Sequence, residues 1–340
     1  MADGNYDAIL IVSFGGPDGP DDVIPFLENV LRGRNVPRER MLEVAEHYHH
    51  FGGKSPINEQ NRALIAALRE ELDRRGPHLP VYWGNRNWHP LLTDTLREMA
   101  DAGVKRAIAF VTSAYSSYSG CRQYRENIAA ACAALGDRAP QVDKIRVFFN
   151  HPGFVGPMAA NVRKALEHFP ADARSSVPVL FTAHSIPSSM ADGCRYVTQL
   201  TEATRLVAEQ AGVGEARLVY QSRSGPPTQP WLEPDVCDAI RELHARGVRQ
   251  LVIAPIGFIS DHMEVLYDLD TEAADLCREL GIDMVRAATV GTDPAFVGMV
   301  RDLIAERHFG QAERVAIGAL PANHDVCPLD CCPAPAMRRP

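Results

Sequence analysis

The sequence has no long apolar run. No window of the 340 residues approaches the roughly 20 consecutive apolar residues that a helix needs to cross a bilayer. We therefore expect no stable insertion into a membrane. The first residues are acidic and lead straight into an apolar run, without the basic start or small-residue cleavage site of a secretory signal. We expect a cytoplasmic protein.

The chain also has fewer basic than acidic residues. Its 35 Lys and Arg residues face 43 Asp and Glu residues, for a formal net charge of −8. Binding to nucleic-acid phosphates needs clustered Lys and Arg, so we expect no nucleic-acid partner. One local cluster of positive charge is an exception, and it consists of Arg32, Arg34, Arg38 and Arg40. These arginines form either a solvated loop and helix start or a patch that receives an anionic ligand.

The motifs of several common enzyme classes are missing. The chain has no Walker loop, no GxSxG elbow and no HExxH helix, and the loop Ser13–Gly19 lacks GxGxxG spacing. A nucleotide role is therefore weakly supported. The segment Phe51–Asn58 offers glycines, the Ser55 hydroxyl and a cation before an expected helix, whose free N–H groups can cradle a carboxylate or phosphate.

Short apolar runs alternate with amphipathic stretches, which predicts an α/β fold with parallel sheets and covering helices. In the stretch Asn61–Arg74, for example, leucines recur every four residues and form one apolar face. Four strands are expected in each half. They are Ala8–Ser13, Val81–Gly84, Ala107–Val111, Ile145–Phe149, Val179–Ala183, Leu218–Gln221, Leu251–Ile256 and Met284–Ala287.

The two halves also resemble each other in sequence. Ala8–Phe14 matches Val179–His184, and Ala102–Val111 matches Arg246–Pro255. Two matches in the same order favour duplicated doubly wound lobes, while chance similarity among α/β units is the alternative.

A break at His151-Pro152-Gly153 predicts the boundary between these lobes. We therefore expect an N-terminal lobe over residues 1–152, a C-terminal lobe over residues 153–310 and an extension over residues 311–340. The end of the extension is rich in proline and cysteine and has no periodicity, so it should be disordered unless something pins it.

Three carboxylates recur every four residues after the expected strand Leu251–Ile256. This spacing places Glu264, Asp268 and Glu272 on one face of a helix. They form either a solvated acidic stripe or, because they begin at a βα loop next to a histidine, a row of ligands for a divalent metal in transit.

His184 ends a buried apolar run that is closed by Pro187. A lone histidine is more often a structural group than a catalyst. In open α/β sheets, however, ligands bind beyond the carboxyl ends of the strands. An imidazole there can accept a proton near neutral pH or ligate a metal, so His184 is a candidate catalytic residue.

Taken together, five segments resemble the ferrochelatase family, over a stretch from about Tyr6 to Glu306. Each is weak alone, but all five follow the order of the family. They are Ser13–Pro17, Phe51–Asn58, Phe181–Pro187, Gln221–Pro226 with Trp231–Pro234, and Pro255–Asp270. The resemblance implies two Rossmann-like, chelatase-type lobes, each a four-stranded parallel sheet flanked by helices, with a porphyrin bound between them. It also implies a lyase that inserts Fe²⁺ as substrate and uses no organic cofactor.

The resemblance also implies residue roles. His184 would abstract pyrrole protons or ligate the incoming iron, and Glu264 would face it as its acid/base partner, with the division of these duties left open. Asp268 and Glu272 match carboxylates that lead to an outer metal site. Four further residues match positions that bind the porphyrin and its propionates: Phe14, Arg32, Ser55 and Tyr124.

Two positions depart from the family pattern. Phe14 stands where some relatives have a tyrosine that approaches the porphyrin metal, so this axial oxygen is absent. His47 stands where some relatives have an arginine, which weakens one expected propionate contact.

Three cysteines crowd into the tail, at Cys327, Cys331 and Cys332. In a reducing compartment such a group indicates metal binding rather than a disulfide. The tail resembles an extension that carries a [2Fe–2S] cluster in a subset of the family. Such a cluster needs four thiolates, and Cys121 is the expected fourth ligand. The alternative is a flexible tail with free thiols.

We expect coproporphyrin III to be preferred over protoporphyrin IX. The mouth region Pro17–Pro37 has few large apolar residues and gathers arginines, which suits a soluble tetracarboxylate. The alternatives are a protoporphyrin IX ferrochelatase, a chelatase for another tetrapyrrole or for cobalt or nickel, a haem-binding or delivery protein, and a two-lobed protein that binds a small ligand. We expect the chain to act as a monomer.

Overall fold

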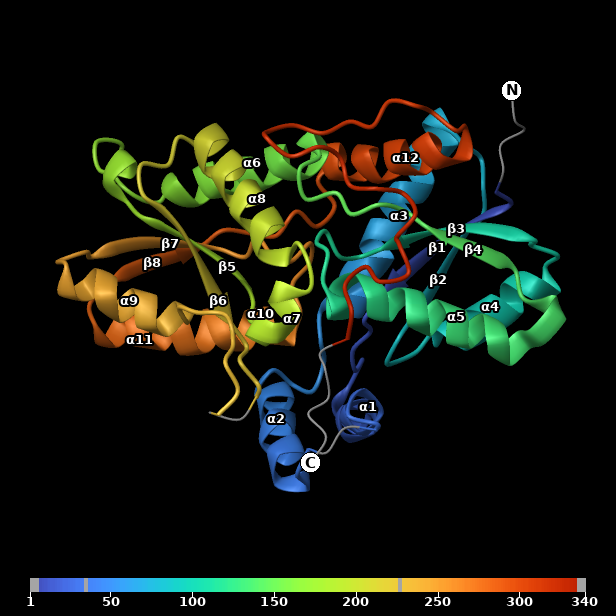
Figure 1. Cartoon of the computed structure of the whole chain (residues 1–340). Helices are drawn as coiled ribbons and strands as arrows, with labels where there is room; N and C mark the ends of the chain where they lie inside the picture. Colours follow the sequence, from blue (N-terminus) through green and yellow to red (C-terminus); the bar gives the residue numbers. More distant parts are fainter. Residues whose placement is uncertain (1–5, 34–35, 226–227, 335–340) are drawn as a thin grey trace.

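The computed structural model of the chain describes residues 6–33, 36–225 and 228–334. Two four-stranded parallel sheets lie side by side, with helices on both faces of each (Figure 1). The predicted fold class is therefore confirmed. Arg34 and Pro226, which belong to the arginine group and to one motif, lie outside the described residues.

The first sheet has the strand order β2-β1-β3-β4. Its central strand β1 is buried along its whole length, because β2 and β3 pair with its two edges and helices cover its two faces. The strands are β1 (Ala8–Ser13), β2 (Val81–Asn85), β3 (Arg106–Val111) and β4 (Gln141–Lys144).

Alternate residues of β1 face two different hydrophobic clusters. Leu10 and Val12 pack with residues of α4 and α5, while Ile9 and Ile11 pack with α3 and the centre of the molecule. The helices of this half are α1 (Val23–Val30), α2 (Arg38–His50), α3 (Ile57–Arg75), α4 (Leu92–Asp101) and α5 (Gln123–Leu135). A π-helical turn, Tyr118–Arg122, leads into α5.

The second sheet repeats this arrangement with the order β6-β5-β7-β8. β5 and β7 hold the positions that β1 and β3 hold in the first sheet, which is the pairing that the sequence matches predict. The strands are β5 (Val179–His184), β6 (Ala216–Gln221), β7 (Gln250–Ala254) and β8 (Asp283–Arg286).

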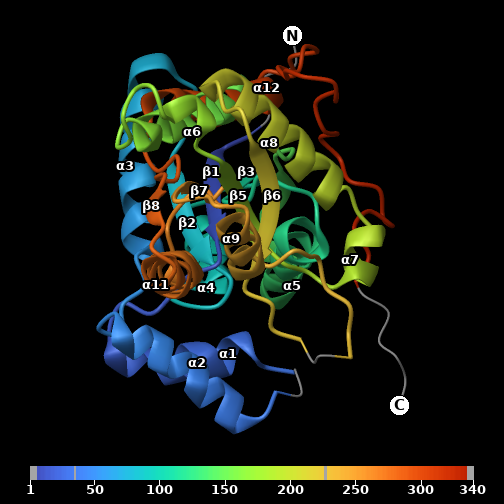
Figure 2. The ribbon, with the colours of Figure 1, turned by 90° about the vertical axis from the view of Figure 1, so that its left-hand side faces the viewer.

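Helices α9 and α11 cover one face of the second sheet, and α6 and α8 cover the other (Figure 2). The helices of this half are α6 (Pro152–Leu166), α7 (Ser188–Asp192), α8 (Tyr196–Ala211), α9 (Val236–Ala245), α10 (Met263–Tyr267), α11 (Ala274–Glu279) and α12 (Pro294–His308). A π-helical segment, Asp268–Ala273, joins α10 to α11.

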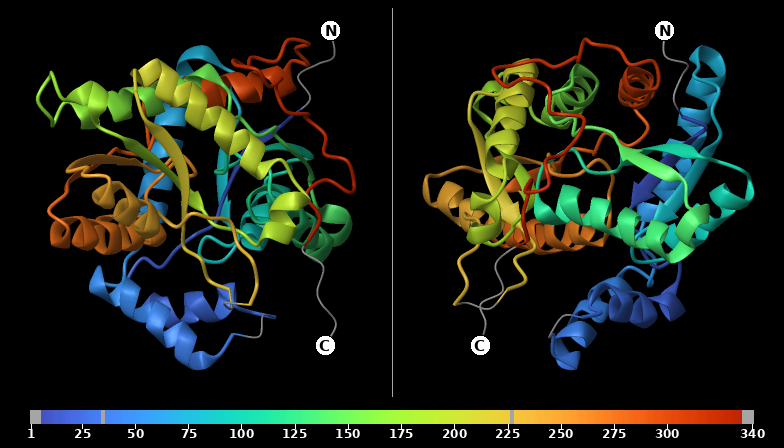
Figure 3. Two further views of the ribbon diagram at one scale, coloured as in Figure 1. Left: turned by 60° about the vertical axis from the view of Figure 1, so that its left-hand side comes forward. Right: turned by 45° about the vertical axis from the view of Figure 1, so that its right-hand side comes forward.

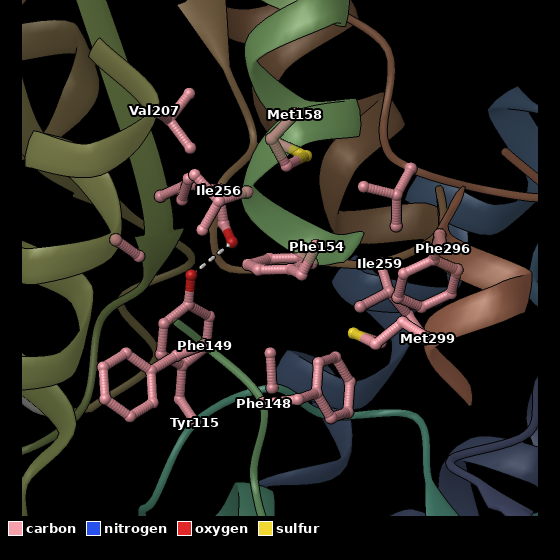
Figure 4. Packing of buried hydrophobic residues seen from close by; sticks show 14 of the residues in the cluster. Tyr115, Phe148, Phe149, Phe154, Met158, Val207, Ile256, Ile259, Phe296 and Met299 are labelled. Carbon is pink, nitrogen blue, oxygen red and sulfur yellow. Dashed lines mark hydrogen bonds between the residues drawn. The ribbon is translucent and has the colours of Figure 1, made fainter. Parts of the chain in front are cut away.

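One hydrophobic cluster joins the two sheets. It contains residues of both central strands and a group of aromatic rings between them, including Phe148, Phe154 and Phe296 (Figure 4). Helix α12 packs on α3 as well as on α6. The predicted lobe boundary at residue 152 stays a prediction, because the final helix of the second half packs against the first half.

The apolar run Ile145–Phe149 was wrongly predicted as a strand. The observed strand β4 lies just before it, at Gln141–Lys144, and only the Ile145 N–H continues the ladder to the Ala109 carbonyl, at 2.9 Å. The run is buried in the central cluster instead. The hydrophobicity of this run therefore reflects its burial in the core, and the run does not pair as a strand of the sheet.

Helices α1 and α2 lie outside both sheets as a separate arm (Figures 1 and 2). The arm has its own small apolar cluster, built on Phe26, Leu27 and Met41. Among the described residues, none of the helices has both the length and the apolar character needed to span a membrane.

The extension runs back over the molecule without a helix or strand between residues 311 and 334 (Figure 3). The Asn150 side-chain amide donates to the carbonyls of Leu320 and Pro321, at 2.7 and 3.3 Å. Arg146 donates to the Val315 carbonyl at 2.9 Å. These bonds from the body of the protein pin the described part of the extension, so it needs no periodic structure of its own.

Candidate active site

His184 and Glu264 face each other at the carboxyl edge of the second sheet. His184 is the last residue of β5, and Glu264 lies in the first turn of α10, which follows β7. Because β5 and β7 are neighbouring parallel strands, their ends meet at one edge. Nε2 of His184 lies 3.6 Å from Oε2 of Glu264, and the side chains are 32% and 49% exposed.

The backbone orients the His184 ring. Its Nδ1–H donates to the Ser185 carbonyl, which can only accept, and this leaves Nε2 directed at Glu264. The Tyr196 hydroxyl donates to the His184 carbonyl at 3.0 Å and so holds the end of the strand. The imidazole is therefore presented to the edge in one orientation.

The two side chains form an ion pair. Burial lowers the pKa of His184, but the charge and hydrogen bond of Glu264 outweigh this effect and raise that pKa to about 9. Burial raises the pKa of Glu264, yet the charges of His184 and His262 lower it to about 2. At neutral pH the proton of the pair lies on His184 and Glu264 is a carboxylate.

The acidic row predicted on one α-helical face is interrupted. Helix α10 ends at Tyr267, and Asp268 opens the π-helical segment, so the α-helical spacing from Glu264 to Glu272 does not hold. Asp268 instead accepts hydrogen bonds from Gln221 Nε2, at 3.1 Å, and from the Ser222 hydroxyl. Glu272 is exposed farther along.

Asp268 has an unusual protonation equilibrium for a carboxyl group. Burial, with the neighbouring charges of Glu264 and Glu272, raises its pKa to about 7, against the hydrogen bonds from Ser222 and Gln221. Burial and the charge of Asp235 also raise the pKa of Glu272. A bound divalent cation would reverse these repulsions, which is the electrostatic behaviour expected of carboxylates that handle a metal.

The loop before α10 is braced by other groups. Asp261 forms ion pairs with Arg286, with an oxygen to nitrogen distance of 3.1 Å, and its N–H donates to Gln60 Oε1 at 2.8 Å. The His262 ring packs edge-on against Phe258 at 4.6 Å between centroids. These contacts fix the backbone that presents Glu264.

Arg86, which the sequence reasoning missed, connects two predicted porphyrin residues. Its guanidinium lies over the Tyr124 ring, 4.5 Å from the centroid, and 5.5 Å from the centroid of Phe14. Its Nε donates to Asn127 Oδ1 at 2.7 Å. Arg86 follows Asn85, the last residue of β2, so the strand-end rule that indicates His184 applies to it as well.

A large polar hollow lies beside this arginine. It has a volume of about 790 Å³ and opens between α1, the turn after β2 and α5. Arg32 and Arg86 both line it, and Asn29 and Asn127 add amide groups. The hollow therefore offers donors to anionic groups, although Glu28 also lines it and neither His184 nor Glu264 does.

Ser55 is placed differently from the other predicted porphyrin residues. It is 2% exposed, its N–H donates to the Pro17 carbonyl at 2.9 Å, and it packs so closely on Gly16 that an added Cβ there would lie 2.8 Å from Ser55 Cβ. Ser55, like Phe14 and Tyr124, is absent from the described residues that line the hollow, whereas Arg32 is among them. It braces the glycine loop that follows β1.

A stacked pair of rings lies where the arm contacts the second half. His47 of α2 lies flat on Tyr267 of α10, with ring centroids 3.6 Å apart and planes 7° apart. Burial and the charge of Arg40 lower the pKa of His47, so the ring is neutral at neutral pH and stacks without the cost of burying a charge.

The four predicted cysteine ligands come together. Cys121, in the π-helical turn before α5, is 3% exposed and contacts Cys327 and Cys332. Sγ of Cys331 lies 3.5 Å from Sγ of Cys332. Hydrogen bonds with Cys327 and Cys332 lower the pKa of Cys121, which favours the thiolate, the form that binds metals.

Two arginines hold the tail against this cysteine group. Arg125 donates to the carbonyls of Cys327 and Pro328, both at 3.2 Å, and Arg122 donates to the Cys331 carbonyl at 3.4 Å. Four thiols from two distant parts of the chain are therefore fixed in one place. This donor set fits an iron–sulfur cluster, which takes four thiolates.

Comparison with known proteins agrees with this geometry. The ferrochelatase family model matches residues 6–308. The chain belongs to the ferrochelatase family. It is 62% identical to the ferrochelatase of Rhodopirellula baltica, over 96% of this chain and 93% of that protein. It is 55% identical to the coproporphyrin III ferrochelatase of Streptomyces coelicolor, over 98% and 95%.

Solved structures support the fold of this ferrochelatase family member. SirB from Bacillus subtilis with Fe³⁺ superposes with a TM-score of 0.56 at 14% identity, over 89% of this chain and 97% of that one. At that identity the likeness shows a shared chelatase fold.

Proposed function

We propose that the chain inserts Fe²⁺ into coproporphyrin III. The observation that carries this proposal is the His184–Glu264 pair, fixed at the sheet edge of a ferrochelatase family member. Its similarity to coproporphyrin III ferrochelatases, such as the one from Streptomyces coelicolor, supports the substrate.

Insertion of Fe²⁺ releases two protons from the pyrrole N–H groups of the porphyrin. The Glu264 carboxylate, whose pKa lies near 2, stays ionised and attracts the cation, but it is a weak proton acceptor while it is paired with His184. His184 becomes a base or a metal ligand only after it gives up its own proton. The ion pair is therefore the resting state, and removal of the His184 proton precedes any step in which this ring accepts one.

Asp268 and Glu272 extend the proposed metal route away from this pair. Carboxylate oxygens suit a hard divalent cation, and Fe²⁺ also accepts imidazole. Because Asp268 has a pKa of about 7, part of the population is protonated at neutral pH, and a cation must displace that proton to bind. Weak binding of this kind suits transfer rather than storage.

Two features of the first half support a tetracarboxylate substrate. Arg32 and Arg86 line the hollow of about 790 Å³ that lies next to the predicted porphyrin face. On the described part of the arm and its loops, Val36 and Leu42 are the large apolar residues that are exposed, which is little surface for a lipid-delivered dicarboxylate.

Anaerobic iron insertion with coproporphyrin III and protoporphyrin IX side by side tests the proposal. We expect faster insertion into coproporphyrin III, and failure with both porphyrins would overturn the function. A haem-binding or delivery protein would instead bind porphyrin in a His184→Ala variant and show no loss of metallation. His78→Ala, at an exposed histidine in the loop before β2, is a matched control.

We further propose that Cys121, Cys327, Cys331 and Cys332 hold a [2Fe–2S] cluster. Such a cluster supplies one-electron redox chemistry when bound. The contact of Cys331 with Cys332 and the bonds from Arg122 and Arg125 that hold the tail against Cys121 support this assignment. Freshly purified protein should show sulfur-to-iron absorption bands that Cys121→Ser removes. A colourless, iron-free protein, or a Cys121→Ser protein with an unaltered spectrum, would contradict it.

We also propose a cytoplasmic location and a monomer. Eight free cysteines suit a reducing compartment. Sedimentation of the purified chain at several concentrations tests the oligomeric state, and fractionation of cells tests the location.

A further inference from the structure

Three side chains at the outer edge of the cysteine group converge on one point. A ring nitrogen of His324 and the sulfurs of Cys327 and Cys331 all lie within 4.8 Å of one another. His324 Nε2 is 3.9 Å from Cys331 Sγ. Ligands of a tetrahedral Zn²⁺ site, with bonds of about 2.0–2.3 Å, stand roughly 3.5 Å apart, so a small inward shift of these side chains completes coordination.

The backbone around His324 is held on both sides. Asn323 accepts a hydrogen bond from Gln199 Nε2 at 3.4 Å, and Asp325 forms an ion pair with Arg314 at 2.6 Å. The imidazole between them is exposed, yet its Cα is fixed. A ligand held in this way loses little conformational entropy when a metal binds.

The two cysteines are positioned independently of His324. The carbonyl of Cys327 accepts from Arg125, and the carbonyl of Cys331 accepts from Arg122. Arg122 belongs to the π-helical turn, and Arg125 belongs to the first turn of α5. The backbone at each of the three ligands is therefore held by its own contacts, which is the arrangement of a preformed site.

The donor set selects a particular class of ion. Cys332 Sγ lies 3.5 Å from Cys331 Sγ but outside the group of three atoms that lie within 4.8 Å of one another, so it becomes a fourth ligand only after its side chain turns toward them. One imidazole with three thiolates is a common ligand set of structural zinc sites. Thiolate and imidazole ligands favour Zn²⁺ and similar transition metals, whereas Mg²⁺ and Ca²⁺ prefer oxygen.

The group of His324, Cys327 and Cys331 is more accessible to solvent than Cys121 is. Cys121 is buried, whereas His324 is exposed and Cys327 and Cys331 are half-buried. A hollow of about 230 Å³ opens next to His324, Cys331 and Cys332. An ion therefore reaches His324 from solvent without any movement of the chain around Cys121.

We propose that His324, Cys327 and Cys331, completed by Cys332, bind a single thiophilic divalent cation of the Zn²⁺ class. The site shares three cysteines with the [2Fe–2S] site but uses His324 in place of Cys121. A single ion and an assembled cluster therefore exclude each other. The site does not depend on the porphyrin reaction, because none of its residues belongs to the His184–Glu264 pair.

Titration of the full chain with Co²⁺ tests the site, after any bound metal has been removed with a chelator under reductant. Co²⁺ reports its ligands by absorption: thiolate-to-cobalt charge transfer together with strong visible bands marks a tetrahedral sulfur-rich site. We expect one such ion per chain. Co²⁺ bound at His184 and Glu264 gives no thiolate band, so the two sites are distinguished in one spectrum.

Two variants separate the single-ion site from the cluster site. His324→Ala should weaken thiolate-bound Co²⁺ by at least about ten-fold, since loss of even an outer partner of a metal ligand costs that much, and should keep the [2Fe–2S] bands. Cys121→Ser should lose the cluster bands and keep the Co²⁺ site. His78→Ala, at an exposed histidine in the loop before β2, is the matched control.

Reconstitution tests whether a single Zn²⁺ ion and the [2Fe–2S] cluster exclude each other. A chain loaded with one equivalent of Zn²⁺ should gain no [2Fe–2S] bands from iron and sulfide until a chelator removes the zinc. The proposal is overturned if wild-type Co²⁺ titration gives no thiolate band, if His324→Ala binds Co²⁺ as the wild type does, or if the zinc-loaded chain assembles a cluster at the normal rate. The exposed position of His324 lets the variant fold, and an unchanged melting temperature verifies this.

Discussion

The hydroxyl of Tyr115 donates a hydrogen bond of 2.9 Å to the backbone carbonyl of Ile256 (Figure 4). Tyr115 follows β3 of the first sheet, and Ile256 follows β7 of the second. The bond therefore ties the carboxyl edges of the two sheets together a few residues before Glu264. Burial raises the pKa of Tyr115 well above its usual value, so the phenol stays a donor at every physiological pH.

Replacing this tyrosine should weaken the junction between the sheets. Tyr115→Phe keeps the ring in the core but leaves the Ile256 carbonyl without its donor, which costs about 1–3 kcal/mol of unfolding free energy. Urea denaturation measures the loss. Tyr82→Phe, at a half-buried tyrosine of β2, is the control. Equal stability of the two variants would show that the bond contributes nothing.

The pH dependence of iron insertion should report the His184–Glu264 pair. His184 has a pKa of about 9, and only its neutral form can accept a proton, so kcat/KM should rise with pH up to about 9. Glu264→Gln removes the charge that raises this pKa, and the rising limb should move to lower pH. Rates with both proteins over the same buffers measure the shift. An identical limb in the two proteins would mean that His184 is not the base.

Arg86 should contribute to the binding of the porphyrin carboxylates. Loss of one charge-assisted hydrogen bond costs about 1.5–3 kcal/mol, so Arg86→Leu should raise KM for coproporphyrin III roughly ten-fold or more. Steady-state kinetics with the two porphyrins measures the effect, which should be smaller for the dicarboxylate. Arg97→Leu, at an exposed arginine of α4, controls for the loss of a surface charge. A KM unchanged by Arg86→Leu contradicts the assignment.

The buried ion pair of Arg146 and Glu306 should hold the extension in place. The two side chains are 0% and 4% exposed and meet at 2.8 Å, and Arg146 also binds the Val315 carbonyl of the extension. Glu306→Gln leaves the guanidinium without its counter-ion, a change that costs about 3–5 kcal/mol in buried pairs.

Two measurements follow this change. Urea denaturation gives the loss of stability, and the rate of thiol labelling at Cys327 and Cys331 should rise as the extension loosens. Glu279→Gln, at an exposed glutamate of α11, is the control. Unaltered stability together with unaltered labelling would show that the extension is held elsewhere.

Local pattern was enough to place seven of the eight strands of the two sheets. The run Ala8–Ser13 is uniformly apolar because β1 is buried on both faces, and Leu64, Leu68 and Leu72 recur every four residues because one face of α3 enters the core. The strand-end position of His184 follows from the same logic. The run Ile145–Phe149 misled because hydrophobicity reports burial and carries no information on pairing.

The arrangement of the candidate site could not be predicted from the sequence pattern alone. The spacing of Glu264 and Asp268 predicts one helical face, but a π-helical segment starts at Asp268, where Gln221 and Ser222 of the neighbouring strand end bind its carboxyl. Arg86 shares the strand-end position that indicates His184, but this signal alone does not separate it from a solvated arginine. Its position over the rings of Tyr124 and Phe14, two predicted porphyrin residues, is what singles it out.

The sequence by itself determined the α/β class and the strand end that carries His184, because buried strands and amphipathic helices are visible in short-range periodicity. That Glu264 faces His184 was implied by the resemblance to ferrochelatases, and the order of β5 and β7 in the sheet brings the two residues together. Contacts across the chain were decided by the tertiary structure: the approach of Cys121 to Cys327, the convergence of His324 on Cys331 and the bond from Tyr115 to Ile256. Such contacts depend on how whole helices and strands pack, and periodicity along the chain does not encode that packing.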